Sequence, residues 1–268
     1  MGESSQTHVD RYFASEARFW LELYERSDVF AAIHRERRTR ALAWVDGLGL
    51  PAGARVLEVG CGAGLTAVEL ARRGFAVDAT DTVAEMREQT ARRARDAGVE
   101  LRVAHADAHR LAYDDGSFDL VLALGVVPWL HDPGRAIREV ARVTRRGGSV
   151  ILSADNRRRL IGLVDPALAP ALAKPRELVR RLLRRPAWQG VRPLQHTPGA
   201  FDAMLAGAGL ERVDTATLGF GPFTFMWRPA LPDRVAVRLH GRLQSLADRG
   251  APLLRSAGAQ YLVLARRA

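Results

Sequence analysis

The chain has 268 residues, enough for one α/β domain with additional helices. Its single cysteine, Cys61, excludes an internal disulfide framework and a zinc site of the usual cysteine spacing. The formal net charge is +10, and much of it is local, because ten basic residues against two acidic ones lie between positions 156 and 192.

The first ten residues, MGESSQTHVD, are polar and lack the basic-then-apolar pattern of a secretory signal. No apolar run approaches the roughly 18–20 residues that a membrane-spanning helix requires. We therefore expect a short polar tail on a cytoplasmic protein. Two amphipathic helices are predicted to follow it, over residues 11–25 and 34–48.

The middle of the chain alternates short runs rich in Val, Leu and Ala with longer helical patterns, which is typical of βαβ units and a parallel sheet. The predicted strands cover residues 55–59, 76–80, 101–104, 118–124 and 149–154. The helical patterns between them cover residues 65–73, 83–97 and 133–144.

Downstream, residues 156–192 are predicted to be largely helical and basic, and a short helix follows over 201–207. Two final strands, over 211–218 and 260–265, are separated by a long insert that contains Gly221-Pro222, Pro229 and Pro232. Seven strands in this alternation predict an α/β fold, with one doubly wound, mostly parallel sheet and a helical cap.

The first predicted strand runs directly into Gly60-Cys61-Gly62-Ala63-Gly64 and then into a helix. Alternate glycines allow a tight turn and close approach of a ligand, and the helix start offers free N–H groups. The GxGxG spacing differs from the GxGxxG of a dinucleotide site. Glu58 precedes the turn by two residues, which disfavours a diphosphate and suits a cationic ligand.

Two further acids follow the next two predicted strands. Asp81 lies where a carboxylate can accept hydrogen bonds from both ribose hydroxyls of a nucleoside, and Asp107 lies where it can meet an adenine amino group. A single acid in such a place often only caps a helix. Three acids at the carboxyl edges of three successive strands indicate a nucleoside site.

Residues 54–154 resemble class I S-adenosylmethionine (SAM)-dependent methyltransferases. The segment from Val56 to Gly64 is similar to the first motif of that family, and Asp81-Thr82-Val83-Ala84-Glu85-Met86 and Asp107-Ala108 are similar to its ribose and adenine positions. Residues 118–121, 129–133, 139–143 and 146–148 follow the family pattern around the fourth and fifth strands. The similarity is greatest to the small-molecule branch that includes ubiquinone/menaquinone C-methyltransferases.

The resemblance implies a Rossmann-like methyltransferase fold, SAM as the cofactor, no metal, and SN2 transfer by proximity with or without a general base. From the residue patterns on either side of residues 54–154, we expect N-terminal cap helices (1–50), a SAM-binding core (51–155), a basic helical lid (156–200) and the C-terminal part of the sheet with an aromatic insert (201–268). The cofactor-binding residues that the resemblance implies are Glu58, Gly60, Cys61, Gly62, Gly64, Asp81, Thr82, Met86, Asp107, Ala108, Leu124 and Tyr12.

The acceptor is expected to be a small organic molecule, apolar or aromatic. The candidate contacts are Trp129, Tyr24 and the aromatic cluster Phe220, Phe223, Phe225 and Trp227, which is explained equally well as core. The candidate general bases are His131, His196 and His240, each of which also has a simple structural explanation. Cys61 is better explained as the small residue that the turn needs than as a nucleophile.

In the basic segment, Leu178, Val179, Leu182 and Leu183 fall on one helical face among arginines. Such a helix is typical of contact with an anionic membrane surface or an anionic partner, and the alternative is a lid helix whose leucines pack on the domain.

Three other functions remain open. The charge is compatible with a nucleic-acid methyltransferase, although residues 123–129 lack an Asn/Asp-Pro-Pro-aromatic signature and no RNA-binding module is evident. The same fold can also serve a cyclase or decarboxylase, or a non-catalytic binding module. The sequence leaves the methylated atom and the oligomeric state undetermined.

Overall fold

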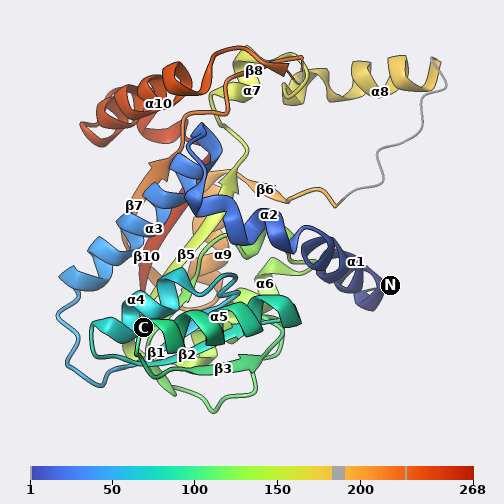
Figure 1. The fold of residues 1–268 in the computed structure, drawn as a ribbon. Coiled ribbons are helices and arrows are strands. Elements are labelled where there is room, and N and C mark those ends of the chain that lie inside the picture. Colours follow the sequence, from blue (N-terminus) through green and yellow to red (C-terminus); the bar gives the residue numbers. More distant parts are fainter. Residues whose placement is uncertain (1, 183–190, 227) are drawn as a thin grey trace.

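The computed structural model describes residues 2–182, 191–226 and 228–268, and a single sheet forms its centre (Figure 1). Seven strands follow the order β3-β2-β1-β4-β5-β10-β7, and the two-residue strand β6 (Gln195–His196) pairs with β5. The seven are β1 (Arg55–Val59), β2 (Ala76–Asp81), β3 (Arg102–His105), β4 (Phe118–Ala123), β5 (Thr144–Asn156), β7 (Leu210–Leu218) and β10 (Gln260–Arg267). β10 alone among the seven runs in the direction opposite to the other six, so the predicted mostly parallel, doubly wound sheet is confirmed.

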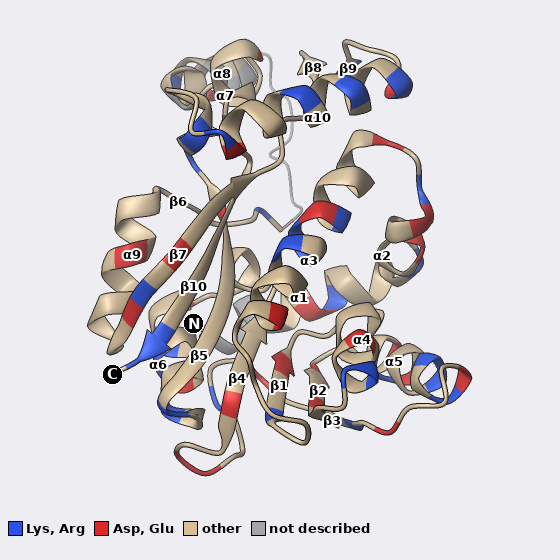
Figure 2. Cartoon of the chain, turned by 90° about the vertical axis from the view of Figure 1, so that its left-hand side faces the viewer, with Lys and Arg blue, Asp and Glu red and all other residues tan. Residues whose placement is uncertain are grey.

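Helices cover both faces of this sheet (Figure 2). α6 (Pro133–Val143) and α9 (Pro198–Gly207) lie on one face, and α3 (Val29–Gly47), α4 (Leu65–Arg72) and α5 (Ala84–Asp96) lie on the other. The two buried layers follow from alternation along the strands, since Leu57 packs with residues of α6 and α9 while Val56 packs with residues of α3 and α4.

The N-terminus differs from the predicted polar tail. Residues Gly2–Ser15 form α1, which is followed by α2 (Ala17–Glu22) and the 3-10 turn η1 (Leu23–Glu25). Val9 is buried, and the rings of Tyr12 and Phe13 contact Trp129 in the 3-10 turn η2 (Val127–Trp129). The prediction was wrong because the few apolar residues of this polar segment lie on the face that packs on the domain.

A second lobe stands beyond the sheet (Figure 1). It contains α7 (Ile161–Val164), the 3-10 turn η3 (Pro170–Leu172), α8 (Ala173–Leu182), the short hairpin β8 (Thr224–Phe225) and β9 (Arg228–Pro229), and α10 (Asp233–Asp248). Between α10 and β10 lies the 3-10 turn η4 (Leu254–Ser256). α10 was not predicted; it packs on α3, where Ala236 meets Val29 and Ile33.

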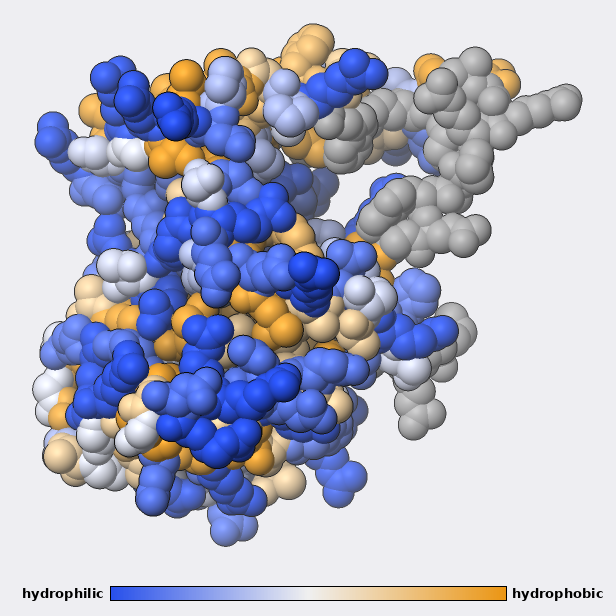
Figure 3. All heavy atoms as spheres, viewed as in Figure 1, coloured by the Kyte–Doolittle hydropathy of each residue, from blue (hydrophilic) through white to orange (hydrophobic). Residues whose placement is uncertain are grey.

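The leucine face predicted in the basic segment does not pack on the domain in the described residues. Leu178, Val179 and Leu182 of α8 are 59%, 52% and 73% exposed, whereas Leu183 lies outside the described residues. Hydrophobic atoms are visible at the surface of this lobe in Figure 3. The prediction of a lid helix whose leucines pack on the domain is therefore wrong for this part of the chain. Contact of the helix with an anionic membrane surface or partner stays a prediction. Within the described ranges no helix is both long and apolar enough to span a membrane.

Asn156 fixes the carboxyl end of β5. Its fully buried side-chain amide donates to the backbone oxygens of Ser256 and Gly258, both at 2.8 Å, and its side-chain oxygen accepts from the Arg158 backbone N–H at 2.9 Å. A Cβ atom at Gly258 would lie 2.7 Å from the Leu218 backbone nitrogen, so β5, β7 and the start of β10 meet closely here.

We expect Asn156→Ala to lower the free energy of unfolding by about 2–4 kcal/mol, because two buried carbonyls lose their donor and one N–H loses its acceptor. Urea denaturation measures this change. Arg157→Ala, which removes an exposed side chain next to it, should change the free energy by less than about 0.5 kcal/mol. Equal stability of the two variants would contradict the anchoring role of Asn156.

Candidate functional site

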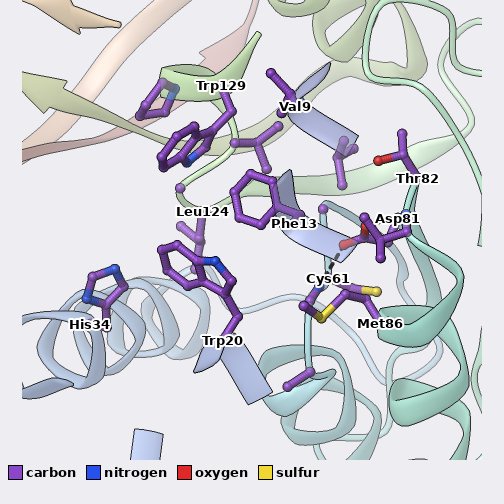
Figure 4. Close-up of a pocket in the computed structure, with 18 of the residues that line it drawn as sticks. Val9, Phe13, Trp20, His34, Cys61, Asp81, Thr82, Met86, Leu124 and Trp129 are labelled. Carbon is purple, nitrogen blue, oxygen red and sulfur yellow. Dashed lines mark hydrogen bonds between the residues drawn. The ribbon is translucent and has the colours of Figure 1, made fainter. Parts of the chain in front are cut away.

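One cavity of about 490 Å³ lies at the carboxyl edge of the sheet, in the range typical of small-molecule sites. The loop after β1, the ends of β2 and β4, and the helices α1 to α3 all contribute to its walls. In Figure 4, Asp81, Thr82 and Met86 lie on one side, His34 lies on the other, and Phe13 and Trp20 lie between them.

The loop after β1 is held in place from two sides. The Cys61 backbone N–H donates to the Thr80 oxygen and the Gly62 N–H donates to the Asp81 carboxylate, both at 2.9 Å. From α5, the Thr90 hydroxyl donates to the Gly62 oxygen, also at 2.9 Å. Backbone groups of the loop are thus tied to the end of β2 and to the helix that follows it.

The three glycines of this loop are required for different reasons, although each has a positive φ. A Cβ atom at Gly60 would lie 2.4 Å from Val126, and one at Gly64 would lie 2.8 Å from the Thr90 Cα atom. A Cβ atom at Gly62 would meet nothing within 4 Å, and Gly62 lines the cavity. Gly60 and Gly64 therefore allow packing of the protein, whereas Gly62 leaves space for a ligand.

Two buried acids face this space. Burial raises the pKa of Glu58 to about 8, even though hydrogen bonds from Thr66 and Ala67 act in the opposite direction. The Glu58 Oε2 atom has no hydrogen-bond partner among the described residues. Burial also raises the pKa of Asp81, despite the N–H groups of Gly62 and Val83 that donate to its two carboxylate oxygens. A cationic or hydroxyl-bearing ligand would supply hydrogen-bond donors to both carboxylates and favour their charged forms.

Asp107 also lines the cavity, together with Glu58 and Asp81. Burial opposes its ionisation, but hydrogen bonds from the backbone and ring of His109 outweigh that effect and lower the pKa of Asp107. His131, a predicted base, stacks on His109 with a ring separation of 3.8 Å and does not line the cavity.

The other two predicted bases also lie away from the cavity. His240 accepts from the Phe220 backbone N–H at 3.2 Å and its Nε2 atom lies 3.0 Å from a Glu36 carboxylate oxygen. His196 belongs to β6, with its ring 6.2 Å from that of Phe201. Neither imidazole lines the cavity, so the geometry gives no support to a catalytic role for either.

The predicted cofactor residues converge on the cavity with one exception. All of them line it except Gly64, which lies behind the loop at the start of α4. Of the predicted acceptor contacts, Tyr24 and Trp129 line the cavity.

The aromatic insert does not reach the cavity in the described part of the chain. Phe220 is buried elsewhere, Phe223 packs with Val29 and Ile33, and Phe225 is 57% exposed. Trp227 lies outside the described residues.

The aromatic walls come instead from the N-terminal helices. Phe13, Phe19, Trp20 and Phe30 line the cavity, with Phe13 and Trp20 in edge contact with Trp129 at 5.0 and 6.4 Å. Tyr12 stacks on Trp129 at 5.7 Å. Of the aromatic residues in these helices, only Tyr12 and Tyr24 were predicted as contacts, because a regular aromatic spacing does not tell which side of a helix faces a cavity.

Five polar residues at the far side of the cavity were also missed: His34, Arg37, Asp155, Arg159 and Gln260. One signal was available, since Asp155 lies near the carboxyl end of a strand, at the same edge of the sheet as Glu58 and Asp81. His34 has its pKa lowered to about 3 by burial, and its Nδ1 atom lies 2.8 Å from the Phe30 oxygen. That carbonyl can only accept, so Nδ1 carries the proton and Nε2 is an acceptor.

Comparisons with known proteins agree with this geometry. Residues 57–152 match a protein family described as a methyltransferase domain. The chain is 29% identical over 219 residues to the ubiquinone biosynthesis O-methyltransferase of Xanthomonas axonopodis pv. citri, covering 81% of this chain and 86% of that protein. It is 33% identical over 177 residues to the protein of the same name from Ruegeria pomeroyi, covering 66% and 67%.

The fold has a counterpart among solved structures. The magnesium protoporphyrin IX methyltransferase of Synechocystis with bound S-adenosylhomocysteine (SAH) superposes with a TM-score of 0.67 at 19% identity, over 98% of this chain and 99% of that one. On the evidence of its relatives and its fold, the chain belongs to the class I SAM-dependent methyltransferases of the small-molecule type.

Proposed function

We propose that this methyltransferase acts on a hydroxyl oxygen of a small aromatic acceptor. The observation that carries the proposal is a single cavity with two kinds of wall, acids and a glycine loop at one end and aromatic rings in the middle. The names of the two relatives, both O-methyltransferases, support oxygen as the atom methylated.

The residues at the loop end fit SAM. The unpartnered Glu58 oxygen is suited to the ammonium group of the cofactor, and the open space at Gly62 leaves room for it. Each Asp81 oxygen accepts one backbone N–H and has capacity for a ribose hydroxyl. We assign the adenine amino group to Asp107. Tyr12, Thr82, Met86, Ala108 and Leu124 complete this wall.

When bound, SAM supplies an electrophilic methyl group on a sulfonium. The protein needs to hold the acceptor in line with it and exclude water, which can supply much of the rate enhancement. Phe13, Trp20 and Trp129 form a suitable apolar wall for an aromatic ring. The neutral His34 can accept a hydrogen bond from an acceptor hydroxyl, but its low pKa makes it an orienting group rather than an efficient base.

The loop glycines provide a matched pair of variants. An alanine at Gly62 or Gly64 would have to adopt a positive φ, which costs about 1 kcal/mol of stability at either position. Gly64→Ala should lose about 2–4 kcal/mol of unfolding free energy, because its Cβ atom meets the Thr90 backbone.

Gly62→Ala should lose only the cost of its positive φ, about 1 kcal/mol, yet bind SAH about 10-fold or more weakly, because its methyl group enters the ligand space. Denaturation and calorimetry measure the two effects. Unchanged SAH affinity in Gly62→Ala, or equal stability of the two variants, would show that the loop has been misassigned.

Mass spectrometry with SAM carrying a deuterated methyl group tests the reaction itself. Incubation with a panel of catechols and phenols should give products that carry the label as a methyl ether. Label attached to carbon or nitrogen would reject the proposed atom. Acceptor turnover without label would indicate that the cofactor serves only as a scaffold, and no turnover of any hydroxyl-bearing aromatic compound by the SAM-loaded protein would count against the acceptor class.

A further inference from the structure

The far end of the cavity is built from elements that are distant in the sequence. Arg37 comes from α3, Asp155 from the end of β5, Arg159 from the segment after it, and Gln260 from the start of β10. Asp155 and Gln260 are directly opposite each other in the antiparallel register. Their side chains therefore lie on the same face of the sheet, at the edge where β5 ends and β10 begins.

These side chains have hydrogen-bonding capacity that the described part of the chain does not use. The Arg37 Nε atom and the Gln260 Oε1 atom are buried without a partner. Among the described residues, no donor is hydrogen-bonded to the Asp155 carboxylate and neither arginine forms an ion pair, although both arginines favour ionisation of Asp155. Buried polar groups are normally paired, so a ligand is the natural partner for this cluster.

The backbone makes room for Arg37. A Cβ atom at Gly125 would lie 2.6 Å from its Nη1 atom and 3.0 Å from its Nη2 atom, so only glycine lets the guanidinium lie against the end of β4. The Gly125 N–H donates to the Ser153 hydroxyl at 2.7 Å, which fixes this position between β4 and β5. The guanidinium therefore lies directly against the backbone at Gly125, with no acidic ion-pair partner among the described residues.

The charge at this end is positive. Two guanidinium groups face one carboxyl group, since burial keeps His34 neutral. Burial also raises the pKa of Asp155 to about 6, against the effect of Arg159 and Arg37. Even with Asp155 ionised, the two arginines leave one positive charge uncompensated among partly buried groups, which is unfavourable without an anion.

We propose that the acceptor carries a carboxylate, which Arg37 and Arg159 bind at this end of the cavity. This inference rests on the proposed function and adds the acid class to the acceptor. A guanidinium binds a carboxylate through two parallel N–H donors, which gives both affinity and orientation. With its carboxylate fixed here, an acceptor would extend past Trp20 and Trp129 toward the glycine loop.

Binding to the SAH-loaded protein tests the inference without knowledge of the natural acceptor. The probes are protocatechuate and caffeate, each compared with its methyl ester. The ester keeps the ring and hydroxyl groups of the acid but lacks its negative charge. Tryptophan fluorescence measures binding, since Trp20 and Trp129 line the cavity. We expect the wild type to bind at least one acid about 10-fold or more tightly than its ester.

Arg159→Gln should abolish this preference and leave SAH affinity unchanged. Arg158→Gln is the matched control, because its exposed side chain lies outside the cavity, and it should keep the preference. Arg37→Gln should behave as Arg159→Gln does, and its thermal unfolding shows whether the buried site tolerates the change.

Three results would overturn the inference while SAH still binds: esters that bind as well as acids, no acid bound at concentrations of about 5 mM, or an Arg159→Gln variant that retains the preference. Failure of SAH to bind to the wild type would instead reject the cofactor assignment on which the inference rests. The two failures are therefore distinguishable in the same titrations.

Discussion

The clamp on the loop after β1 is the interaction on which the site depends. Gly62 is held at its N–H by the Asp81 carboxylate and at its oxygen by the Thr90 hydroxyl, so the loop, β2 and α5 form one unit. This arrangement needs glycine at Gly60 and Gly64, where side chains would clash with Val126 and with the Thr90 backbone. It sets the direction of the first turn of α4 and keeps the Gly62 surface open toward the cavity.

The cavity has acidic residues at one end and arginines at the other, which follows from the sheet order. The parallel strands β1 and β2 bring Glu58 and Asp81 to one end, while β5 and the antiparallel β10 bring Asp155 and Gln260 to the other, where Arg37 and Arg159 add positive charge. Aromatic side chains from α1, α2 and η2 separate the two ends. Such a cavity is complementary to a cationic cofactor that lies beside an aromatic acid. Methylation of an aromatic hydroxyl and binding of a carboxylate on the same acceptor are therefore compatible in this cavity.

Much of the fold could be predicted from the sequence, because the strands are runs of apolar residues and the glycine turn has a local signature. β1 was predicted at its observed bounds, and the other six main strands within a few residues, except that β5 begins earlier. The first part of α1, over residues 2–10, and all of α10 were missed because their apolar faces are defined by tertiary contacts. The cofactor end was predictable from local motifs, whereas the far end was not, since Gln260 reaches Asp155 only through the antiparallel pairing of β10 with β5.

Calorimetric titration of SAM and SAH into the wild type and Asp81→Asn tests the central claim most directly, with Asp96→Asn on the exposed end of α5 as the control. We predict that the wild type and the control bind both ligands. Asp81→Asn should lose about 2–4 kcal/mol, or roughly 30- to 1000-fold in affinity, while it remains folded. A wild type that binds neither ligand, or an Asp81→Asn variant that binds as tightly as the wild type, would contradict the assignment of this cavity.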